Sequence, residues 1–178
     1  MTQKEKKESV GLQLLGKDTG GKLVAILQVR AKWNAEKNSP ETYQGACQVT
    51  VHGRLEGGED FMQALLREVK EELGEEIVPA VKALMENGKL VELITLETHE
   101  KHVITYGGIV EEDVLKKLVE KEISPSFGGF RIIQKNEVEK ITNLQKFDRL
   151  IGVADKNIIA MFPDEKESIQ LAFDKLAI

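Results

Sequence analysis

The most constraining feature of this sequence is the helical spacing of apolar residues between Glu59 and Leu73. Apolar side chains recur there every three or four residues, acidic residues open the first turn, and Gly74 stands where the helix would end. The apolar positions are Phe61, Met62, Leu65, Leu66, Val69 and Leu73. The pattern predicts an amphipathic helix, which needs an apolar surface elsewhere in the chain to cover its buried face.

Strand-like segments lie before this helix and alternate with helical segments after it. Two β-rich runs, residues 10–15 and 23–29, flank a glycine-rich turn and predict a hairpin, and residues 46–51 predict a third strand after a loop at 35–42. Further helices are predicted at 78–85, 111–122, 137–141 and 164–176, and further strands at 90–96, 102–110 and 130–134. Interleaved strands and helices favour an α/β fold in which a mixed β-sheet is covered on its faces.

Length and composition favour a single cytoplasmic domain. With 178 residues, of which 41% are apolar and 31% charged, the chain can bury its own core, and we expect a flexible tail at 1–8 and one domain at 9–178. Cys47 is the only cysteine, which excludes an intramolecular disulfide and favours a reducing compartment. The first residues lack the apolar stretch of a secretory signal, and no later run approaches the ~18 apolar residues of a membrane span.

The net charge narrows the range of partners. A formal charge of -5 provides no sequence-wide basic field, so we expect no polymeric nucleic acid as a partner. Acidic balance suits proteins that gather carboxylates around hard cations, but charge alone does not separate these from other soluble proteins. Any chemistry must therefore be read from a local arrangement of residues.

Three glutamates of the predicted helix share one face. Glu68, Glu71 and Glu72 stand at i, i+3 and i+4, within roughly a 100° arc of the helix surface. Like charges this close destabilise an isolated helix by a few tenths of a kcal/mol per pair, so a counter-charge is expected. Mg²⁺ or Mn²⁺ would supply it, neutralise phosphate oxygens and lower the pKa of a bound water. The alternative is a solvated face with an ordinary i,i+4 pair between Arg67 and Glu71.

The spacing of residues before the helix favours the metal site over the solvated face. Residues 53–75 resemble the Nudix box: Gly, five residues, Glu, seven residues, then Arg-Glu-apolar-any-Glu-Glu-any-Gly-apolar. The matching positions are Gly53, Glu59, Arg67, Glu68, Glu71, Glu72 and Gly74. If each position is met by chance about one time in ten, the coincidence is ~10⁻⁷ per starting position. The final apolar position is Glu75 here, which affects the helix exit and not the metal ligands.

The resemblance implies a Nudix-type α/β/α sandwich and a nucleotide pyrophosphatase, a metal-dependent hydrolase that cleaves a phosphoanhydride bond in a nucleoside diphosphate linked to a group X. It implies Mg²⁺ or Mn²⁺ as cofactor and a nucleotide-like small molecule as substrate. The oligomeric state stays open, with a homodimer as one candidate because dimers are frequent in the family. Glu68, Glu71 and Glu72 would bind the metal, with a backbone carbonyl of Gly53 or His52 adding an oxygen.

The other box residues would support this site. Arg67, counted with the catalytic set, would pair with Glu59 to hold the preceding loop against the helix. Gly57 and Gly58 would let that loop turn sharply, and Gly74 would end the helix. These roles come from the resemblance and are expectations for the structure.

Residues outside the box are candidates for binding the substrate. Trp33 and Tyr43 flank the loop at 35–42, where their rings are suited to stack on a nucleobase, although ordinary packing is equally open. Arg54 is a candidate for contacting phosphate, together with Arg30 and Lys32.

The family often uses a further acidic residue from a later loop as a base or extra ligand. The eligible positions are Glu97, Glu100, Glu111 and Glu112, and none is preferred. His99 and His102 stand three residues apart on a predicted strand end or turn, which favours a surface turn over the helical pair of a metalloprotease.

Two other functions remain open. A non-catalytic nucleotide- or metabolite-binding sensor would be expected to lose one or more box glutamates, and an isopentenyl-diphosphate isomerase-like enzyme would depart from the box. All of the box glutamates are present, which favours the hydrolase. The leaving group is not specified, because ADP-ribose, dinucleoside polyphosphates, sugar nucleotides and oxidised nucleoside triphosphates differ in pocket residues outside the box.

Overall fold

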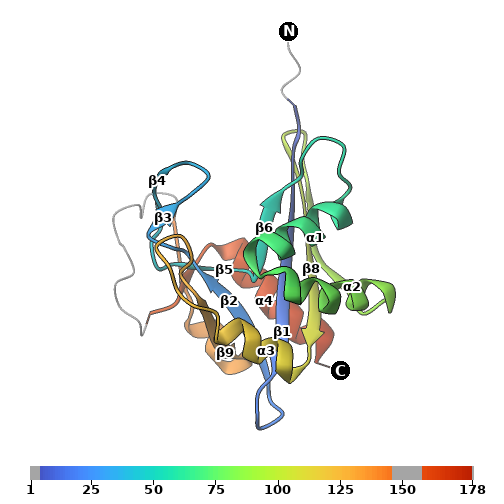
Figure 1. Ribbon diagram of the computed structural model, residues 1–178, viewed down its shortest axis with the longest axis vertical. Helices are drawn as coiled ribbons and strands as arrows, with labels where there is room; N and C mark the ends of the chain where they lie inside the picture. Colours follow the sequence, from blue (N-terminus) through green and yellow to red (C-terminus); the bar gives the residue numbers. More distant parts are fainter. Residues whose placement is uncertain (1–4, 146–157, 178) are drawn as a thin grey trace.

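The computed structural model of the chain describes residues 5–145 and 158–177. Within these residues, seven strands form one mixed β-sheet with the order β5-β2-β1-β8-β7, to which β6 adds by pairing with β1 and β9 by pairing with β2 (Figure 1). The strands are β1 (Lys7–Lys17), β2 (Leu23–Val29), β5 (Cys47–Gln48), β6 (Val51–Arg54), β7 (Val91–Glu97), β8 (Lys101–Val110) and β9 (Phe130–Gln134). The pair β1–β8 is parallel and the other pairs are antiparallel.

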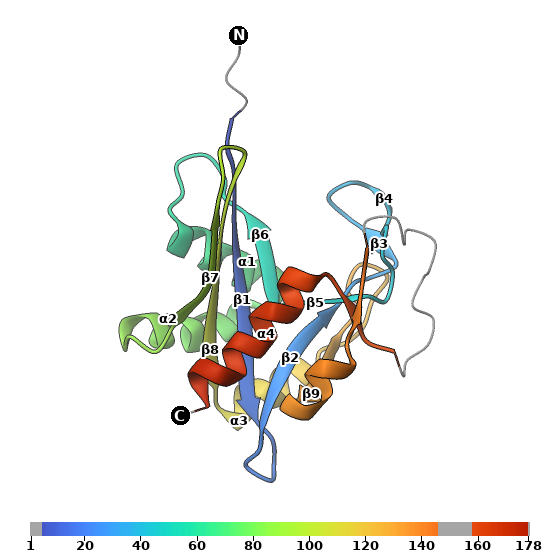
Figure 2. The ribbon, with the colours of Figure 1, turned by 180° about the vertical axis from the view of Figure 1, so that it is seen from behind.

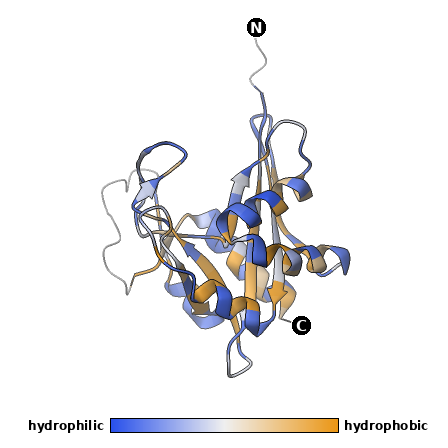
Figure 3. Ribbon diagram, in the orientation of Figure 1, coloured by the Kyte–Doolittle hydropathy of each residue, from blue (hydrophilic) through white to orange (hydrophobic). Residues whose placement is uncertain are grey.

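Helices cover both faces of the sheet, as Figures 1 and 2 show. On one face lie α1 (Phe61–Glu72), α2 (Val78–Glu86) and α3 (Glu112–Val119), and on the other lies α4 (Pro163–Leu176). Each face has its own apolar core: Leu12 and Val69 belong to the first, and Leu15 and Phe173 to the second. The predicted α/β/α sandwich with a mixed sheet is therefore confirmed. Figure 3 shows the apolar residues concentrated on the central strands and on the inward sides of the helices.

Several elements differ from their predicted bounds for local reasons. β1 begins at Lys7 rather than at residue 10, because Lys7 and Glu8 pair with Lys101 and His102 of β8. The strand predicted at 46–51 is divided into β5 and the start of β6, which pair with different strands. The helix predicted at 137–141 is a 3₁₀ helix, η2 (Lys135–Lys140), and a further 3₁₀ turn, η1 (Glu75–Ile77), precedes α2.

Two short two-stranded sheets were not predicted. β3 (Trp33–Asn34) and β4 (Ser39–Pro40) form a hairpin within the segment expected to be a loop, and β10 (Thr142–Asn143) pairs with β11 (Ala160–Met161). Strands of two residues carry too little alternation to be recognised in a sequence. In the part of the chain that the structure describes, no helix combines the length and apolar character needed to cross a membrane.

The edge of β1 changes partner in the middle of the strand. Residues Ser9–Leu12 pair with β6, whereas Leu15–Lys17 pair with β2, so β6 and β2 diverge at Gln13 and Leu14. Two fully buried polar side chains bridge the divergence. The Thr50 hydroxyl accepts the Leu14 N–H at 2.8 Å and donates to the Ile26 carbonyl at 2.6 Å, and the Gln13 amide donates to the same carbonyl at 3.1 Å. We call this arrangement the fork.

The fork gives a first prediction. Thr50→Val removes the hydroxyl but keeps the side-chain shape, which leaves the buried Leu14 N–H without its acceptor. We expect the free energy of unfolding in urea to fall by about 1–3 kcal/mol. Thr50→Ser retains the hydroxyl and is the matched control. Equal unfolding midpoints for the two variants would show that the hydroxyl does not bridge the strands.

Candidate active site

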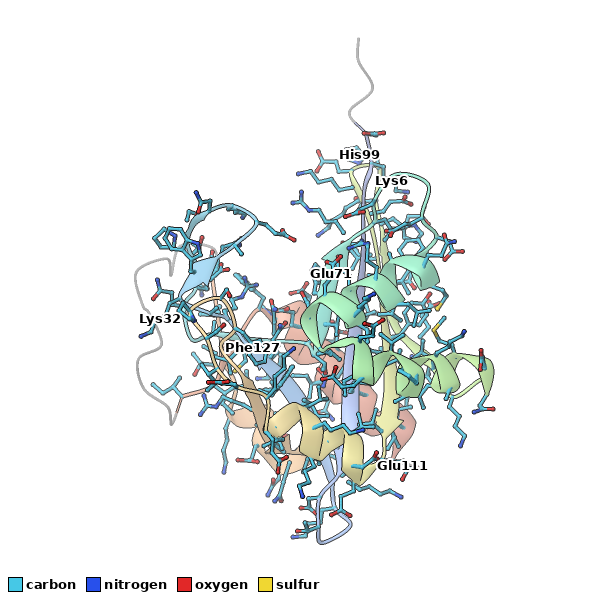
Figure 4. All side chains as sticks on the ribbon, in the orientation of Figure 1. Lys6, Lys32, Glu71, His99, Glu111 and Phe127 are labelled. Carbon is cyan, nitrogen blue, oxygen red and sulfur yellow. The ribbon has the colours of Figure 1, made fainter. Side chains whose placement is uncertain are left out.

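A cleft of about 860 Å³ lies between α1 and the loops that follow β2 and precede β9. One wall is formed by β6 and by the cleft-facing side of α1, which carries the three box glutamates Glu68, Glu71 and Glu72. The other wall comes from the end of β2, the β3–β4 hairpin and residues Ser126, Phe127 and Gly128. In Figure 4, Glu71 points from α1 into the space that faces this second wall. The fork thus places the helix face opposite a set of loops.

Asp60 caps the N-terminus of α1 and fixes the residue at which this helix begins. Its side chain accepts the Gln63 N–H at 2.8 Å, and the Gln63 side chain accepts the Asp60 N–H at 2.9 Å. This capping box satisfies donors that the first turn of a helix leaves free. It also fixes where the first turn starts, and therefore which residues of α1 face the cleft.

Arg67 joins the loop to the helix, as the resemblance implied. Its Nε donates to Glu59 Oε1 at 2.7 Å, and its Nη2 donates to Glu59 Oε2 at 3.0 Å and to the Arg54 carbonyl at 2.8 Å. Its Nη1 donates to Glu68 at 2.8 Å and to Glu71 at 3.4 Å. The hydrogen bonds from Arg67, with one from the Glu56 N–H, lower the pKa of Glu59 to about 2, and the pKa of Arg67 is raised in turn.

Gly53 is required by the close approach of Glu68. A Cβ atom built at Gly53 would overlap the carboxylate of Glu68, so only glycine leaves room for this buried side chain. The other glycines of the box differ among themselves: Gly58 and Gly74 have φ values of 86° and 111°, which favour glycine, whereas Gly57 has no positive φ and open space around it. The sharp turn predicted for both loop glycines thus rests on Gly58.

Negative charge accumulates in the cleft beyond what Arg67 balances. Burial, together with the charge of Glu68, raises the pKa of half-buried Glu72 to about 8, and Glu36 and Glu71 add to the effect. Burial also raises the pKa of Glu68, against the lowering effect of its hydrogen bond from Arg67. A Glu72 oxygen accepts the His52 N–H at 3.4 Å. Crowded carboxylates of this kind are stabilised by a cation.

The donor set fits a hard divalent cation in its chemistry. Carboxylate and carbonyl oxygens are the ligands that Mg²⁺ and Mn²⁺ prefer, and Glu68, Glu71, Glu72 and Gly53 all line the same cleft. Among the described residues, no three His, Cys, Asp or Glu side chains already converge closely enough to hold an ion. Arg67 donates to one oxygen of Glu68 and one of Glu71, so each carboxylate has a second oxygen that these hydrogen bonds do not use.

The candidate substrate residues separate into two groups. Trp33, Arg54 and Arg30 line the cleft, and Trp33 is 40% exposed. Tyr43 is not among the cleft residues: its ring packs edge-on against Phe162, with centroids 5.0 Å apart, and the Arg30 guanidinium lies 5.7 Å from its centroid. The proposed stacking role of Tyr43 is therefore replaced by a packing role behind the cleft wall.

The four acidic residues proposed outside the box do not line the cleft. Glu97 pairs with Lys6 at 2.6 Å near the tip of the β7–β8 hairpin, and Glu111 lies at the start of α3. Figure 4 shows His99 and Glu111 at opposite ends of the molecule, both away from Glu71. His102 contacts the ring of Phe61, with centroids 4.8 Å apart, and lies 3.7 Å from Glu8. It lies on strand β8, so these histidines form no metalloprotease pair.

Sequence reasoning missed other residues of the cleft. The acidic ones are Glu36, Glu41 and Glu56, and the rest include Gln28, Gln48, Asn34 and Phe127. Glu36 and Glu41 lie in the segment that was interpreted as a loop, and Phe127 follows Ser124-Pro125-Ser126 in a turn-like stretch. No spacing rule connects these segments to residues 53–74, so only the folded chain brings them together.

Comparison with known proteins gives one family and a set of similar folds. A family model described as the NUDIX domain matches residues 6–151. A mutT/nudix family protein from Listeria innocua has a TM-score of 0.61 and 16% identity, over 96% of this chain and 94% of that one. An Ap4A hydrolase from C. elegans, in a binary complex, has a TM-score of 0.51 and 16% identity, over 96% of this chain and 98% of that one.

A third protein of similar fold was solved in complex with another protein. The C-terminal domain of mouse MUTYH, in complex with human PCNA, has a TM-score of 0.51 and 14% identity, over 97% of this chain and 91% of that one. Among curated proteins, none matches the chain. At such identities, the likeness of these structures shows a shared fold, and it does not specify a substrate.

The ion pair between Arg67 and Glu59 gives a second prediction. The pKa of Glu59 in the folded chain, about 2, lies below its ordinary value of 4.5, so its charged form stabilises the fold above pH 4.5, and that stabilisation is lost as the pH falls through about 2. We expect Glu59→Gln to lower the midpoint of unfolding in urea at neutral pH. The difference in midpoint between this variant and the wild type should become smaller below pH 4.5.

A matched control comes from the same loop. Glu56 lies 3.7 Å from Arg67 with a largely exposed side chain, so Glu56→Gln should change the midpoint much less. A gap between wild type and Glu59→Gln that stays constant down to acid pH would contradict the assigned ion pair.

Proposed function

The chain belongs to the NUDIX family, whose domain model matches residues 6–151, and we propose that it is a divalent-metal-dependent hydrolase of nucleoside diphosphates linked to a group X. The family match indicates the activity of a Nudix pyrophosphohydrolase. The observation that carries the finer proposal is the cleft-facing side of α1, where Glu68, Glu71 and Glu72 gather more negative charge than Arg67 balances. Such a site is suited to a cation and, through it, to a pyrophosphate.

The protein's own residues prepare the site. Glu59 and the Arg54 carbonyl hold Arg67, and Arg67 holds Glu68 and Glu71 in the unliganded arrangement. Gly53 lets Glu68 lie against β6, where a backbone carbonyl of Gly53 or His52 is the proposed additional oxygen ligand. A bound Mg²⁺ or Mn²⁺ would neutralise pyrophosphate oxygens and activate water for attack at phosphorus.

The residues that line the cleft suit the proposed reaction. Water oxygen bonds to one phosphorus while the bridging oxygen leaves with the other phosphate, so a nucleoside monophosphate and a phosphorylated X are the products. Trp33, Phe127 and Arg54 line the cleft, which supports our proposal that the two aromatic rings receive the nucleobase and that Arg54 binds phosphate oxygens. We include Phe127 in place of Tyr43.

Other features of the assignment stay predictions. We propose a tail at 1–8 and one domain over 9–178, of which residues 1–4, 146–157 and 178 lie outside the described residues. The strand β1 already begins at Lys7. A homodimer, a cytoplasmic location and the lack of a polymeric nucleic-acid partner are likewise proposed.

The carboxylates give the test of the proposed function. Glu71→Gln and Glu72→Gln each replace a carboxylate proposed to bind the ion with a neutral amide of the same shape, and we expect kcat to fall by roughly 100-fold or more with little loss of stability. Glu75→Gln is the control, because Glu75 is largely exposed in η1, just after the same helix, and pairs with Lys70 at 3.3 Å.

Activity should be measured on ADP-ribose, a dinucleoside polyphosphate, a sugar nucleotide and a nucleoside triphosphate, with both products identified. EDTA should abolish turnover and Mg²⁺ or Mn²⁺ restore it, and calorimetry should show uptake of the ion by the wild type. Full turnover by Glu72→Gln would contradict the assignment. Tight nucleotide binding without product would favour the sensor, and an allylic isomer from isopentenyl diphosphate would favour the isomerase.

A separate prediction concerns the close contact between Gly53 and Glu68. Gly53→Ala places a methyl group where the Glu68 carboxylate lies, so the carboxylate must move. A shift of about 1 Å in a catalytic group can cost roughly 100-fold in rate, and we expect kcat to fall on that order. Gly57→Ala adds the same methyl group in open space and should have a much smaller effect. Similar rates for the two variants would show that Glu68 need not occupy this position.

A further inference from the structure

A second cavity, of about 540 Å³, adjoins the cleft at the loop between α3 and β9. Val29, Arg30, Ala31 and Gly128 line both cavities, so the two share a wall. We call the second cavity the side chamber. Its volume lies within the range of about 300–1,000 Å³ that is usual for small-molecule pockets.

The side chamber differs from the cleft in chemistry. Six glutamates line the cleft within the described residues, whereas the described lining of the side chamber includes none and has two cations, Arg30 and Lys32. Ile123 also lines it, and at 68% exposure it is the most exposed large apolar side chain of the described residues. A hollow lined by apolar side chains together with a few polar or charged groups is typical of a small-molecule site.

Backbone hydrogen bonds hold the walls of the side chamber together. The Trp33 N–H donates to the Pro125 carbonyl at 3.0 Å, which joins the β3–β4 hairpin to the loop before β9. The Gly45 N–H donates to the Arg30 carbonyl at 3.0 Å, and a Cβ at Gly128 would overlap the Val29 carbonyl oxygen. The shape is therefore built from backbone contacts rather than from the chance positions of long side chains.

Lys121 connects this wall to the catalytic helix. Its ammonium donates to the Glu72 carbonyl, at the end of α1, at 2.9 Å. The same ammonium lies 4.8 Å from the centroid of the Phe127 ring, which lines the cleft. One lysine thus links the helix that carries the carboxylates to the loop that separates the two cavities.

We propose that the side chamber binds the group X that the reaction releases, and that X is an apolar or aromatic group carried on phosphate, such as a second nucleoside. This inference rests on the proposed function, because it assumes that the scissile pyrophosphate lies against Glu68, Glu71 and Glu72. Lys32, which lines the side chamber and not the cleft, is the cation for the phosphates on the X side, and Arg30, which pairs with Glu41 at 3.6 Å, adds positive charge on the shared wall. Ile123 and Pro125 provide apolar surface for a planar group, and no carboxylate of the described lining repels the phosphate.

Cysteine labelling tests occupancy without any need for turnover. Ile123→Cys introduces a thiol at the side chamber, and the only native cysteine, Cys47, is buried, with burial raising the pKa of its thiol to about 11. The ligands are a methylene-bridged diadenosine polyphosphate and α,β-methylene-ATP. At ten times its dissociation constant, the diadenosine compound should slow maleimide labelling about tenfold, whereas α,β-methylene-ATP, which ends in phosphate, should have little effect.

The matched control is Val119→Cys. Val119 is 49% exposed on α3 and lines neither cavity, so its labelling should be equally fast with and without either ligand. Labelling of Ile123→Cys that is unaffected by the diadenosine compound, or slowed equally by both compounds, would overturn the proposal.

Kinetics with a charged variant separate this inference from the proposed function. Ile123→Glu should raise KM for a dinucleoside polyphosphate about tenfold and leave KM for a nucleoside triphosphate unchanged, whereas Val119→Glu should change neither. Equal changes for both substrates would contradict a site for X. If the wild type cleaves none of the substrates, the proposed function fails, while the labelling experiment still decides whether the side chamber binds an aromatic group.

Discussion

The hydrogen bonds of one guanidinium group are the interaction on which the rest of the site depends. Arg67 extends from α1 and binds Glu59 in the preceding loop, the Arg54 carbonyl at the end of β6, and Glu68 on its own helix. The guanidinium group is planar and carries five N–H donors, which allows one side chain to hold three structural elements. Without it, buried Glu68 would keep a charge beside Gly53 with no partner, and the loop would lose its attachment to the helix.

The fork in the sheet decides where this arrangement can act. Because β1 pairs with β6 along one part of its edge and with β2 along the next, the two partner strands separate and leave room for a cleft between them. Thr50 and Gln13 satisfy the backbone groups that the separation would leave unpaired. The cleft is thus a consequence of strand pairing, and the catalytic helix lies along one side of it because β6 leads directly into α1.

The sequence predicted the parts of the site that lie close together in the chain. The helix, its carboxylates and the loop before it fall within residues 53–74, where spacing alone relates one residue to another. Of the opposite wall, the sequence offered Trp33 and Arg30 by residue type alone. It missed Glu36 and Phe127, since they come from segments whose meeting depends on tertiary pairing. β1 is buried on both faces between Val10 and Leu15, so it shows no alternation that would reveal which residues face each core. The acidic residues that the structure does place on the second wall, Glu36 and Glu41, precede the helix in the chain, whereas the candidates from later loops do not line the cleft.

The distribution of charge across the two cavities makes the binding of metal and substrate interdependent in the proposed function. Among the described residues of the cleft, six glutamates outnumber four basic residues, and the carboxylates of α1 repel an anionic pyrophosphate unless a cation enters with it. The phosphate of X, on the Arg30 side of the shared wall, meets no such repulsion. The ion therefore strengthens binding chiefly for the part of the substrate that lies against α1, and by thermodynamic linkage the substrate strengthens the binding of the ion by the same factor. Arg67 contributes to this coupling, because it donates to Glu68 and Glu71, the same carboxylates that the ion would bind.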